Sequence, residues 1–326
     1  MKTPNSLLLE EKSRTNATLQ GHELNVVTGA FGYTGSYITH RLLAQGKGVV
    51  TLTGHVNHQN PFGDGVSVVP FSFDNPGRLA KRLRGATTLF NTYWVRFPYG
   101  QVSYDRAIEN TMALVEAAEE AGIRRIVHIS VTNASADSPL PYFRGKGLLE
   151  KFIAESRLSY AIIRPTLIFG LGDVLINNIA WLLRRFPVFM IPGSGDYKLQ
   201  PICVEDLAEI ALDAACRKSN MVLDAVGPEV YTFDELVRLI AVAVHSRARI
   251  IHCHPKLALF LTGLIARMVR DVVLTEDEVD GLMENLLVST EQPLGRTSLS
   301  DWLIGHGDTI GIRYASELDR HYHYHK

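Results

Sequence analysis

A short glycine-rich stretch near the start of the chain limits its possible folds more than any other feature. In VVTGAFGYTGSYI, Gly29, Gly32 and Gly35 lie between an apolar run that predicts a strand (24–28) and a helical pattern (35–46). Glycines let the backbone turn tightly and approach a pyrophosphate, which the N–H groups at the helix start bind. A packing turn without a ligand is the alternative. The position after the first strand of a β–α series favours a dinucleotide loop.

The first two thirds of the chain alternate apolar runs with helical patterns. The runs are rich in Val and Ile and apolar throughout, as expected for strands covered by helices on both faces. Further strands are expected at 49–53, 66–71, 87–94, 125–130 and 160–165, and helices at 76–85 and 101–122. This order predicts an α/β fold, a Rossmann-type doubly wound parallel sheet with a smaller, mainly helical C-terminal lobe.

The rhythm changes after Gly170. The pattern predicts a helix at 173–185, an irregular segment at 186–201, a helix at 204–215 and a strand at 221–227, with helices predominating from 228 onward. We expect a leader at 1–22 and an NAD(P)-binding Rossmann domain at 23–170, to which the chain returns at about 201–227. The remaining segments, 171–200 and 228–326, are expected to form a substrate or partner lobe at the carboxyl edge of the sheet.

Charge and cysteine content exclude some classes of protein. The formal net charge is −1 over 326 residues, so no large nucleic-acid surface and no nucleic-acid partner is expected. The three cysteines are widely spaced and odd in number, which predicts reduced thiols in a cytoplasmic protein. The sequence contains no apolar run of about twenty residues, so no transmembrane helix is expected.

The most apolar helical stretch is LALFLTGLIARMV at 257–269, followed by Arg270. It is too short to span a bilayer and contains Arg267, so a buried or half-buried helix is favoured. A peripheral membrane contact or a protein partner at 257–285 is the second interpretation. The oligomeric state is left open.

The end of the second strand bears on the choice of cofactor. Residues 53–58 read TGHVNH, with neither an acidic residue for the adenosine ribose of NAD nor an arginine. The missing carboxylate favours NADP(H) weakly over NAD(H), with Thr53, His55 and His58 as donors to a 2′-phosphate. A solvated loop that accepts both cofactors is the alternative. Asp74 is placed either to contact adenine or to cap the helix at 76.

A tyrosine and a lysine lie one helical turn apart beyond the fifth strand. Tyr142 and Lys146 follow Ser130 in RIVHISVTNASADSPLPYFRGK and share one helix face. A phenol that exchanges a proton with a carbonyl needs a lowered pKa, which a nearby ammonium supplies. Ser130 or Thr132 is expected to hold the substrate oxygen, and Lys146 also to contact the nicotinamide ribose.

Several stretches together resemble the short-chain dehydrogenase/reductase superfamily over residues 24–227. They are TGAFGYTG, the EN of AIENTMALVEAAEEAG, IVHIS, YFRGK, IIRPTLIFG and LQPICVEDLAE. The last two are similar to the extended and atypical branches, which include the NAD-dependent epimerase/dehydratase family. Within these branches the chain looks most like the NmrA-like group and the NAD(P)H-binding accessory subunit of respiratory complex I.

The resemblance implies a set of site residues. Catalytic roles would fall on Tyr142, Lys146, Ser130 and Asn110. Cofactor contacts would fall on Gly29, Phe31, Gly32, Tyr33, Thr34, Gly35, Thr53, His55, Asp74, Asn91, Thr92, Tyr93, Lys146 and Pro165. It implies a Rossmann fold and cofactor binding, but not turnover, because relatives of this kind include sensors and structural subunits.

Two features depart from the family pattern. The tyrosine follows the serine strand closely, which counts against a sugar-nucleotide epimerase. Tyr93, Trp94 and Arg96 are placed beside the nicotinamide, where they either line a flat substrate pocket or fill it.

Other polar residues carry weaker expectations. Asn177 and Asn178 either line the substrate cavity or cap a helix. Arg164, next to Pro165, shapes the cofactor cleft or contacts the ligand. His252 and His254 are not expected to bind zinc, because no second His/Cys cluster lies near them, and no metal site is predicted.

Two main functions remain open, and a sugar-nucleotide epimerase or dehydratase is a further alternative. One is an NAD(P)H-dependent oxidoreductase for a small carbonyl, enone or quinone-like substrate, with Tyr142 as proton donor. The other is a non-catalytic NAD(P)H-binding redox sensor or complex-stabilising subunit. The near-complete Ser, Tyr and Lys set favours the enzyme.

Overall fold

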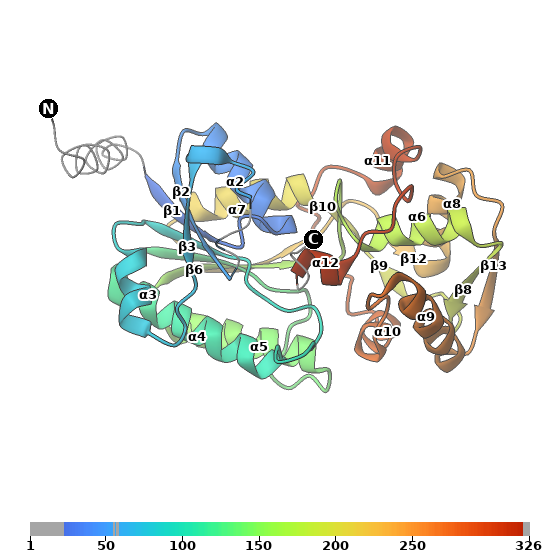
Figure 1. Cartoon of the computed structure of the whole chain (residues 1–326), viewed down its shortest axis with the longest axis horizontal. Coiled ribbons are helices and arrows are strands. Elements are labelled where there is room, and N and C mark those ends of the chain that lie inside the picture. The colour runs from blue at the N-terminus through green and yellow to red at the C-terminus, as the bar shows by residue number, and fades with distance from the viewer. Residues whose placement is uncertain (1–22, 55, 57–58, 322–326) are drawn as a thin grey trace, which may run out of the picture.

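The computed structural model describes residues 23–54, 56 and 59–321, and shows a sheet-containing lobe beside a second, more helical lobe (Figure 1). The expected leader 1–22, the side chains of His55 and His58, and the last five residues lie outside this part of the chain.

The first lobe is built on one seven-stranded sheet whose paired strands are all parallel. Its order is β11–β6–β5–β4–β1–β2–β3. The strands are β1 (Leu24–Thr28), β2 (Gly48–Thr53), β3 (Val66–Pro70), β4 (Thr88–Asn91), β5 (Arg125–Ile129), β6 (Ser159–Pro165) and β11 (Met221–Ala225). The predicted doubly wound Rossmann-type sheet is therefore confirmed.

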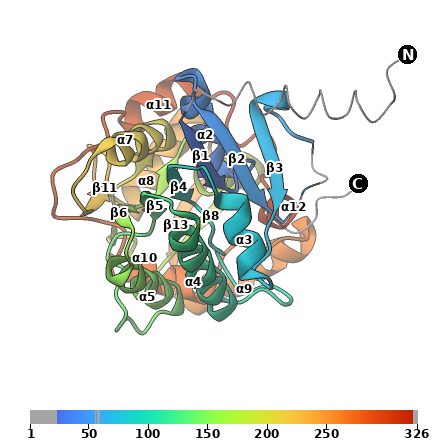
Figure 2. The same ribbon diagram turned by 90° about the vertical axis from the view of Figure 1, so that its left-hand side faces the viewer.

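Helices cover both faces of this sheet (Figure 2). One layer contains α2 (Tyr33–Ala44) and α7 (Val204–Cys216), and the other contains α3 (Pro76–Leu83), α4 (Tyr104–Ala121) and α5 (Pro141–Glu155). Adjacent strand residues alternate between the layers: Val27 packs into the core under α2 and α7, and Val26 into the core under α3 and α4. Both positions must be apolar, which explains why the strands show no polar alternation.

The second lobe has its own apolar core, which includes Phe169, Ile176, Ile191 and Leu236. Its helices are α6 (Leu175–Arg185), α8 (Phe233–Ala243), α9 (Pro255–Val269), α10 (Glu276–Met283), α11 (Leu299–His306) and α12 (Glu317–His321). The roles of the two lobes as cofactor and substrate units stay predictions.

Short strand pairs complete the second lobe and the junction between the lobes. β8 (Val188–Pro192) pairs in parallel with β13 (Arg249–Cys253), and β9 (Lys198–Leu199) pairs antiparallel with β12 (Tyr231–Thr232). β7 (Ile168–Phe169) pairs in parallel with β10 (Ile202–Cys203). In the first lobe, the short 3₁₀ helix η1 (Gly63–Gly65) precedes β3. The expectation of an irregular segment at 186–201 was wrong, because β8 pairs with a strand about sixty residues further along.

Three local predictions need correction. β4 ends at Asn91 rather than 94, so Tyr93 and Trp94 leave the sheet edge. Asn75, not Asp74, caps α3 by accepting a hydrogen bond from Arg78 N. Neither role expected for Asn177 and Asn178 is seen: they donate to the carbonyl oxygens of residues 313 and 315 and so tie the C-terminal segment to α6.

Among the described residues, no helix combines the length and the apolar character needed to cross a membrane. The three cysteines are free thiols; Cys203 is buried and Cys216 is exposed.

Candidate cofactor and substrate site

The glycine loop joins β1 to α2 in a turn that tolerates few side chains. Gly29 has φ +68°, in the left-handed region, and its N–H donates to the Leu52 carbonyl at 3.0 Å. Gly32 N–H donates to the Gly29 carbonyl at 2.8 Å. A Cβ on Gly35 would lie 2.2 Å from that same carbonyl oxygen, so α2 approaches the loop backbone more closely than any side chain permits. The first turn of α2 therefore has the close packing of a pyrophosphate loop.

A cavity of about 530 Å³ opens above this loop. Nine of the predicted cofactor residues line it: Gly29, Phe31, Gly32, Tyr33, Thr34, Gly35, Thr53, Thr92 and Tyr93. Asn91 does not, because it is fully buried and accepts a hydrogen bond from Thr28 Oγ1 at 3.0 Å. Asp74, Lys146 and Pro165 are also not among the residues that line this cavity.

An aromatic group beside the cavity escaped the sequence analysis. Phe71 and Phe73 stack with ring centres 4.6 Å apart, and Tyr93 packs against them at 5.3 and 5.5 Å. Both phenylalanines line the cavity. The Phe-Ser-Phe sequence directly after the third strand could have indicated this group, because alternate residues of an extended chain point to the same side. Flat apolar rings at this edge are suited to stacking on an adenine.

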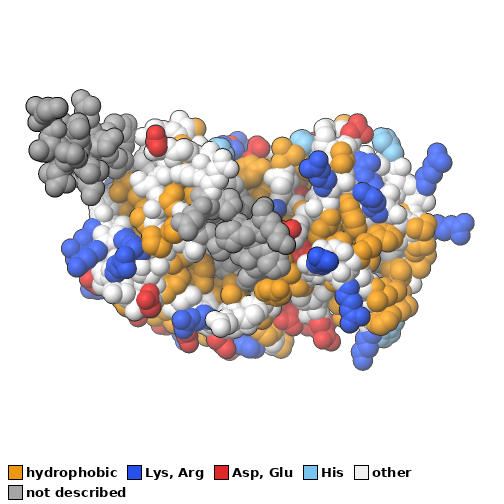
Figure 3. Space-filling view, in the orientation of Figure 1, with side chains coloured by type: hydrophobic (Ala, Val, Ile, Leu, Met, Phe, Trp, Pro, Cys, Tyr) orange, Lys and Arg blue, Asp and Glu red, His pale blue; other side chains and the backbone are white. Residues whose placement is uncertain are grey.

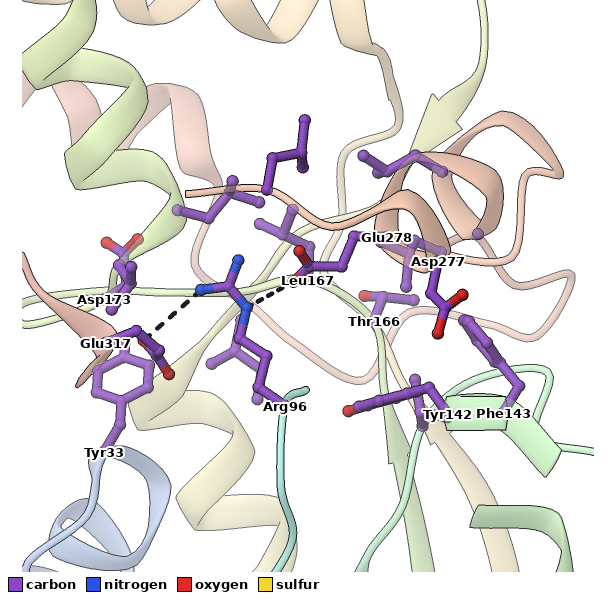
Figure 4. A pocket seen from close by; sticks show the side chains of 18 of the residues that line it. Tyr33, Arg96, Tyr142, Phe143, Thr166, Leu167, Asp173, Asp277, Glu278 and Glu317 are labelled. Atoms are coloured by element: carbon purple, nitrogen blue, oxygen red, sulfur yellow. Dashed lines mark hydrogen bonds and ion pairs between the residues drawn. The ribbon is translucent and has the colours of Figure 1, made fainter. Parts of the chain in front are cut away.

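A second cavity, of about 340 Å³, lies between the lobes and has a mainly apolar lining (Figure 4). Tyr142 and Phe143 of α5 bound it on one side, and Tyr33 and Asp173 on the other. Tyr33, Arg96 and Glu317 line both cavities, so these side chains separate the cofactor space from the inter-lobe space.

Arg96 is held at this boundary by two carboxylates. Its Nε lies 2.5 Å from Glu278 Oε1 of α10, and its Nη1 lies 3.7 Å from Glu317 Oε2 of α12. The chain therefore ties the segment after β4 to both C-terminal helices through one guanidinium. Burial raises the pKa of Asp173 to about 7, although its Oδ1 accepts a hydrogen bond from Ile176 N, in the first turn of α6, at 2.7 Å.

Each of the four residues with an expected catalytic role has another partner in this structure. Ser130 Oγ donates to the Glu150 carboxylate. Lys146 Nζ donates to the Ile129 carbonyl at 2.8 Å, and Asn110 Nδ2 donates to the Tyr93 hydroxyl at 2.9 Å. Tyr142 packs edge-on against the rings of Trp94 and Tyr104 at 5.9 and 6.1 Å.

Trp94 lies between the predicted proton donor and the predicted lysine. Lys146 Nζ lies 4.7 Å from the centre of the Trp94 ring. Gly145 permits this packing, since a Cβ there would approach Trp94 Cη2 to 2.8 Å. The indole covers the lysine, yet Tyr93, Trp94 and Arg96 also line the cofactor cavity, so both alternatives for this segment stay predictions.

Burial controls the ionisation of the pair. It raises the pKa of Tyr142 to about 12, with Glu278 adding to the rise and Arg96 opposing it. Burial also lowers the pKa of Lys146 to about 7, against the opposing effect of Glu150. The expected lowering of the Tyr142 pKa by Lys146 was therefore wrong for this structure, because desolvation of the phenolate dominates. The catalytic roles themselves stay predictions.

The other oxygen-holding and cleft residues are also engaged. Thr132 Oγ1 donates to the Arg164 carbonyl at 2.9 Å. The Arg164 guanidinium pairs with Glu150, the same carboxylate that accepts from Ser130. The role of Arg164 at the cofactor cleft stays a prediction.

The paired histidines have partners of their own. His252 Nε2 lies 3.0 Å from Asp234 Oδ1, and His254 caps α9 through Lys256 N. Within the described part of the chain, no group of three or more His, Cys, Asp or Glu side chains has the arrangement of a metal site.

Comparison with known families and proteins agrees with this geometry. Residues 29–169 match the model of a family described as NAD(P)H-binding. Together with the parallel sheet and the glycine loop, this match defines an NAD(P)H-binding domain with a Rossmann-type fold.

Two curated relatives and one solved structure are informative. The chain is 25% identical over 284 residues to the mitochondrial NADH-ubiquinone oxidoreductase 40 kDa subunit of Neurospora crassa, covering 84% of this chain and 74% of that protein. It is 27% identical over 220 residues to the photosystem II assembly factor Ycf39 of Guillardia theta, covering 66% of this chain and 68% of the relative.

The solved structure is the triphenylmethane reductase of Citrobacter sp. complexed with NADP(H). It superposes with a TM-score of 0.70 at 17% identity, covering 87% of this chain and 99% of that one. At this identity the likeness shows the fold alone. The chain thus contains an NAD(P)H-binding domain and is similar to the 40 kDa subunit of mitochondrial NADH-ubiquinone oxidoreductase.

Proposed function

We propose that this protein holds NAD(P)H as a stable ligand without turning over a carbonyl substrate, and that the bound dinucleotide stabilises or reports on a larger assembly. The observation that carries the proposal is the Trp94 ring, which covers Lys146 Nζ at 4.7 Å. In the enzymes that the sequence resembles, this lysine is the group expected to contact the nicotinamide ribose. The names of the relatives, a respiratory complex subunit and an assembly factor, support a role in an assembly.

NADP(H) is proposed as the preferred form. The described residues that follow β2, Gly54 and Val56, bring no carboxylate to the end of that strand, where NAD-binding relatives of this fold place one. A 2′-phosphate would therefore meet no repulsion there. The expectation of a cytoplasmic location stays a prediction.

A reductase is the second candidate, favoured by the position of Tyr142 at the wall of an apolar cavity beside the cofactor space. Its substrate would be a neutral apolar carbonyl, enone or quinone-like molecule. Four carboxyl groups (Asp173, Asp277, Glu278 and Glu317) and two guanidinium groups (Arg96 and Arg320) line that cavity, and burial raises the pKa of Asp173 to about 7. Arg96 is already paired with Glu278 and Glu317, so the charges of this lining do not favour a diphosphate ligand.

The test starts with titration of the purified protein with NADPH and NADH, following energy transfer from its tryptophans. Trp94 lines the cofactor cavity, so we expect efficient transfer, and a Trp94→Phe variant identifies its share. NADPH consumption is then measured with a panel of quinones and enones. The proposal expects tight binding, preferably of NADPH, and no turnover.

The Tyr142→Phe variant separates the two candidates. Turnover by the wild type that disappears in this variant, with the dissociation constant of NADPH unchanged, would replace the proposal with the reductase. A folded protein that binds neither dinucleotide would refute both.

A further inference from the structure

Helix α9 carries a stripe of large apolar side chains that face solvent. Leu257, Phe260, Leu264 and Met268 are 47%, 64%, 48% and 60% exposed, and we call these four the α9 stripe. At about 100° per residue, they fall within a sector of about 80° on one face of the helix. Isolated exposed apolar residues are common, but a continuous row along one helix marks an interaction surface.

The helix itself is well formed despite this exposure. It begins at Pro255 after the His254 cap and ends at Val269, with Arg270 as its C-cap, and its inner side packs on β8. Ala258 is its only fully buried residue. The large apolar side chains of α9 therefore contribute little to the core of the second lobe, and their exposure needs another explanation.

Positive charge accompanies the stripe. Residues 247–270 contain five Lys and Arg residues and no Asp or Glu, whereas the whole chain has a net charge of −1. Lys256 and Arg267 are exposed and lie on the helix surface just beyond Phe260. Figure 3 shows apolar side chains gathered at the end of the molecule where α9 lies, with Lys and Arg side chains around them.

We propose that the α9 stripe binds the surface of an anionic lipid bilayer, with α9 lying in the plane of the interface. An apolar face bordered by basic side chains has the chemistry of such a helix: the apolar groups enter the acyl boundary and the cations meet the headgroups. A helix of 15 residues is about 22 Å long and cannot cross the roughly 30 Å hydrocarbon layer, so it lies on the membrane.

The complementary charge favours lipid over an uncharged apolar partner. Arg249 lies on β13 and Lys256 and Arg267 lie on α9, while Arg247 and Arg270 flank these elements, and no acidic residue occurs in 247–270. A cationic border of this kind matches an anionic headgroup layer. This inference does not depend on the cofactor or on turnover.

The test is flotation of the full chain with vesicles of phosphatidylcholine alone and of phosphatidylcholine mixed with phosphatidylserine. We expect binding to the mixed vesicles that weakens with added salt, and little binding to phosphatidylcholine alone. A Phe260→Ser/Leu264→Ser double variant should reduce the partition coefficient by about tenfold or more. Lys256→Gln and Arg267→Gln should each reduce it by about fivefold.

Matched control variants lie away from the stripe. Ile304→Ser on α11 removes a side chain that is 84% exposed, and Lys218→Gln removes an exposed charge in the turn after α7. Both should bind like the wild type. All six positions are exposed, so the variants should fold, which circular dichroism checks.

Absence of binding to the mixed vesicles overturns the proposal and leaves a protein as the occupant of the stripe. Equal binding of the serine double variant and the wild type also overturns it. So does binding that is insensitive to both basic substitutions.

Discussion

Replacing Gly35 by alanine is the most direct test of the cofactor loop. The added Cβ would lie 2.2 Å from the Gly29 carbonyl oxygen and 2.8 Å from the Gly29 carbonyl carbon. The distance between the new Cβ and the Gly29 carbonyl oxygen must increase to at least 3.0 Å, because real Cβ atoms essentially never make shorter contacts. The clash is with backbone atoms, so no side chain can rotate away to relieve it. The start of α2 and the loop must therefore move apart by about 1 Å. Overpacking of this kind costs ~1–3 kcal/mol of folding stability.

The same movement should weaken dinucleotide binding. A hydrogen bond of ordinary length that is stretched by about 1 Å is no longer a hydrogen bond. Charge-assisted hydrogen bonds are worth ~1.5–3 kcal/mol each, and each 1.4 kcal/mol changes affinity tenfold. Loss of one phosphate contact therefore predicts a dissociation constant for NADPH that is about 10- to 100-fold higher in Gly35→Ala.

Two further glycines make the experiment a graded series. A Cβ on Gly32 would lie 3.2 Å from the Gly29 carbonyl oxygen, so Gly32→Ala should have a smaller effect. A Cβ on Gly305 in α11 meets nothing within 4 Å, and alanine there should leave affinity unchanged while adding up to ~1 kcal/mol of stability. Fluorescence titration measures the affinities, and urea unfolding the stabilities. A folded Gly35→Ala protein with wild-type affinity would refute the assignment of this loop to the phosphates.

Three other substitutions test the surrounding site by urea unfolding. Arg96→Met should lower the free energy of unfolding by ~2 kcal/mol because it leaves the half-buried Glu278 and the buried Glu317 without their cation. Arg106→Met, in an exposed pair, should cost less than ~0.5 kcal/mol, and equal losses would contradict this. Burial lowers the pKa of Lys146 to about 7, so between pH 7 and its ordinary value of 10.5 the unfolded chain holds a proton that the folded chain has lost. Wild-type stability should then rise with pH across this window relative to Lys146→Met, by at most ~1.4 kcal/mol per pH unit, and a constant difference would show that the lysine stays charged. Gly147→Ala places a Cβ 2.2 Å from the backbone of residue 135 and should destabilise folding by ~3 kcal/mol or more without a specific effect on cofactor affinity in the folded fraction.

The parts of the fold that the sequence predicted well are those governed by local pattern. Val26 and Val27 face opposite helix layers, so a run of apolar residues indicated a strand covered on both sides before any tertiary contact was known. The glycine loop was predictable for the same reason, since its conformation depends on residues within one turn. The segment 186–201 was not, because its strand exists only through pairing with residues 249–253.

The sequence predicted many of the residues that line the candidate site, but not the long-range contacts that hold them in place. The glycine loop and Tyr93 line one cavity as expected. The partners of Arg96 are 182 and 221 residues further along the chain, on helices whose position no local pattern specifies. The same holds for Asn177, which holds residues near 313 rather than a substrate.

The environment of Trp94 shows why a motif does not decide turnover. Tyr142 and Lys146 have the spacing of a proton-transfer pair, but the residue between them on the helix face toward Trp94 is Gly145, whose lack of a side chain admits the indole. The ring then covers Lys146 Nζ, and this amine donates its hydrogen bond to the Ile129 carbonyl instead of to a ligand. For the lysine to reach a nicotinamide ribose, the indole has to move and the Ile129 contact has to break. We therefore expect Trp94→Ala, which removes the ring over Lys146, to raise any turnover of NADPH if the pair is functional and to leave it at zero if it is not.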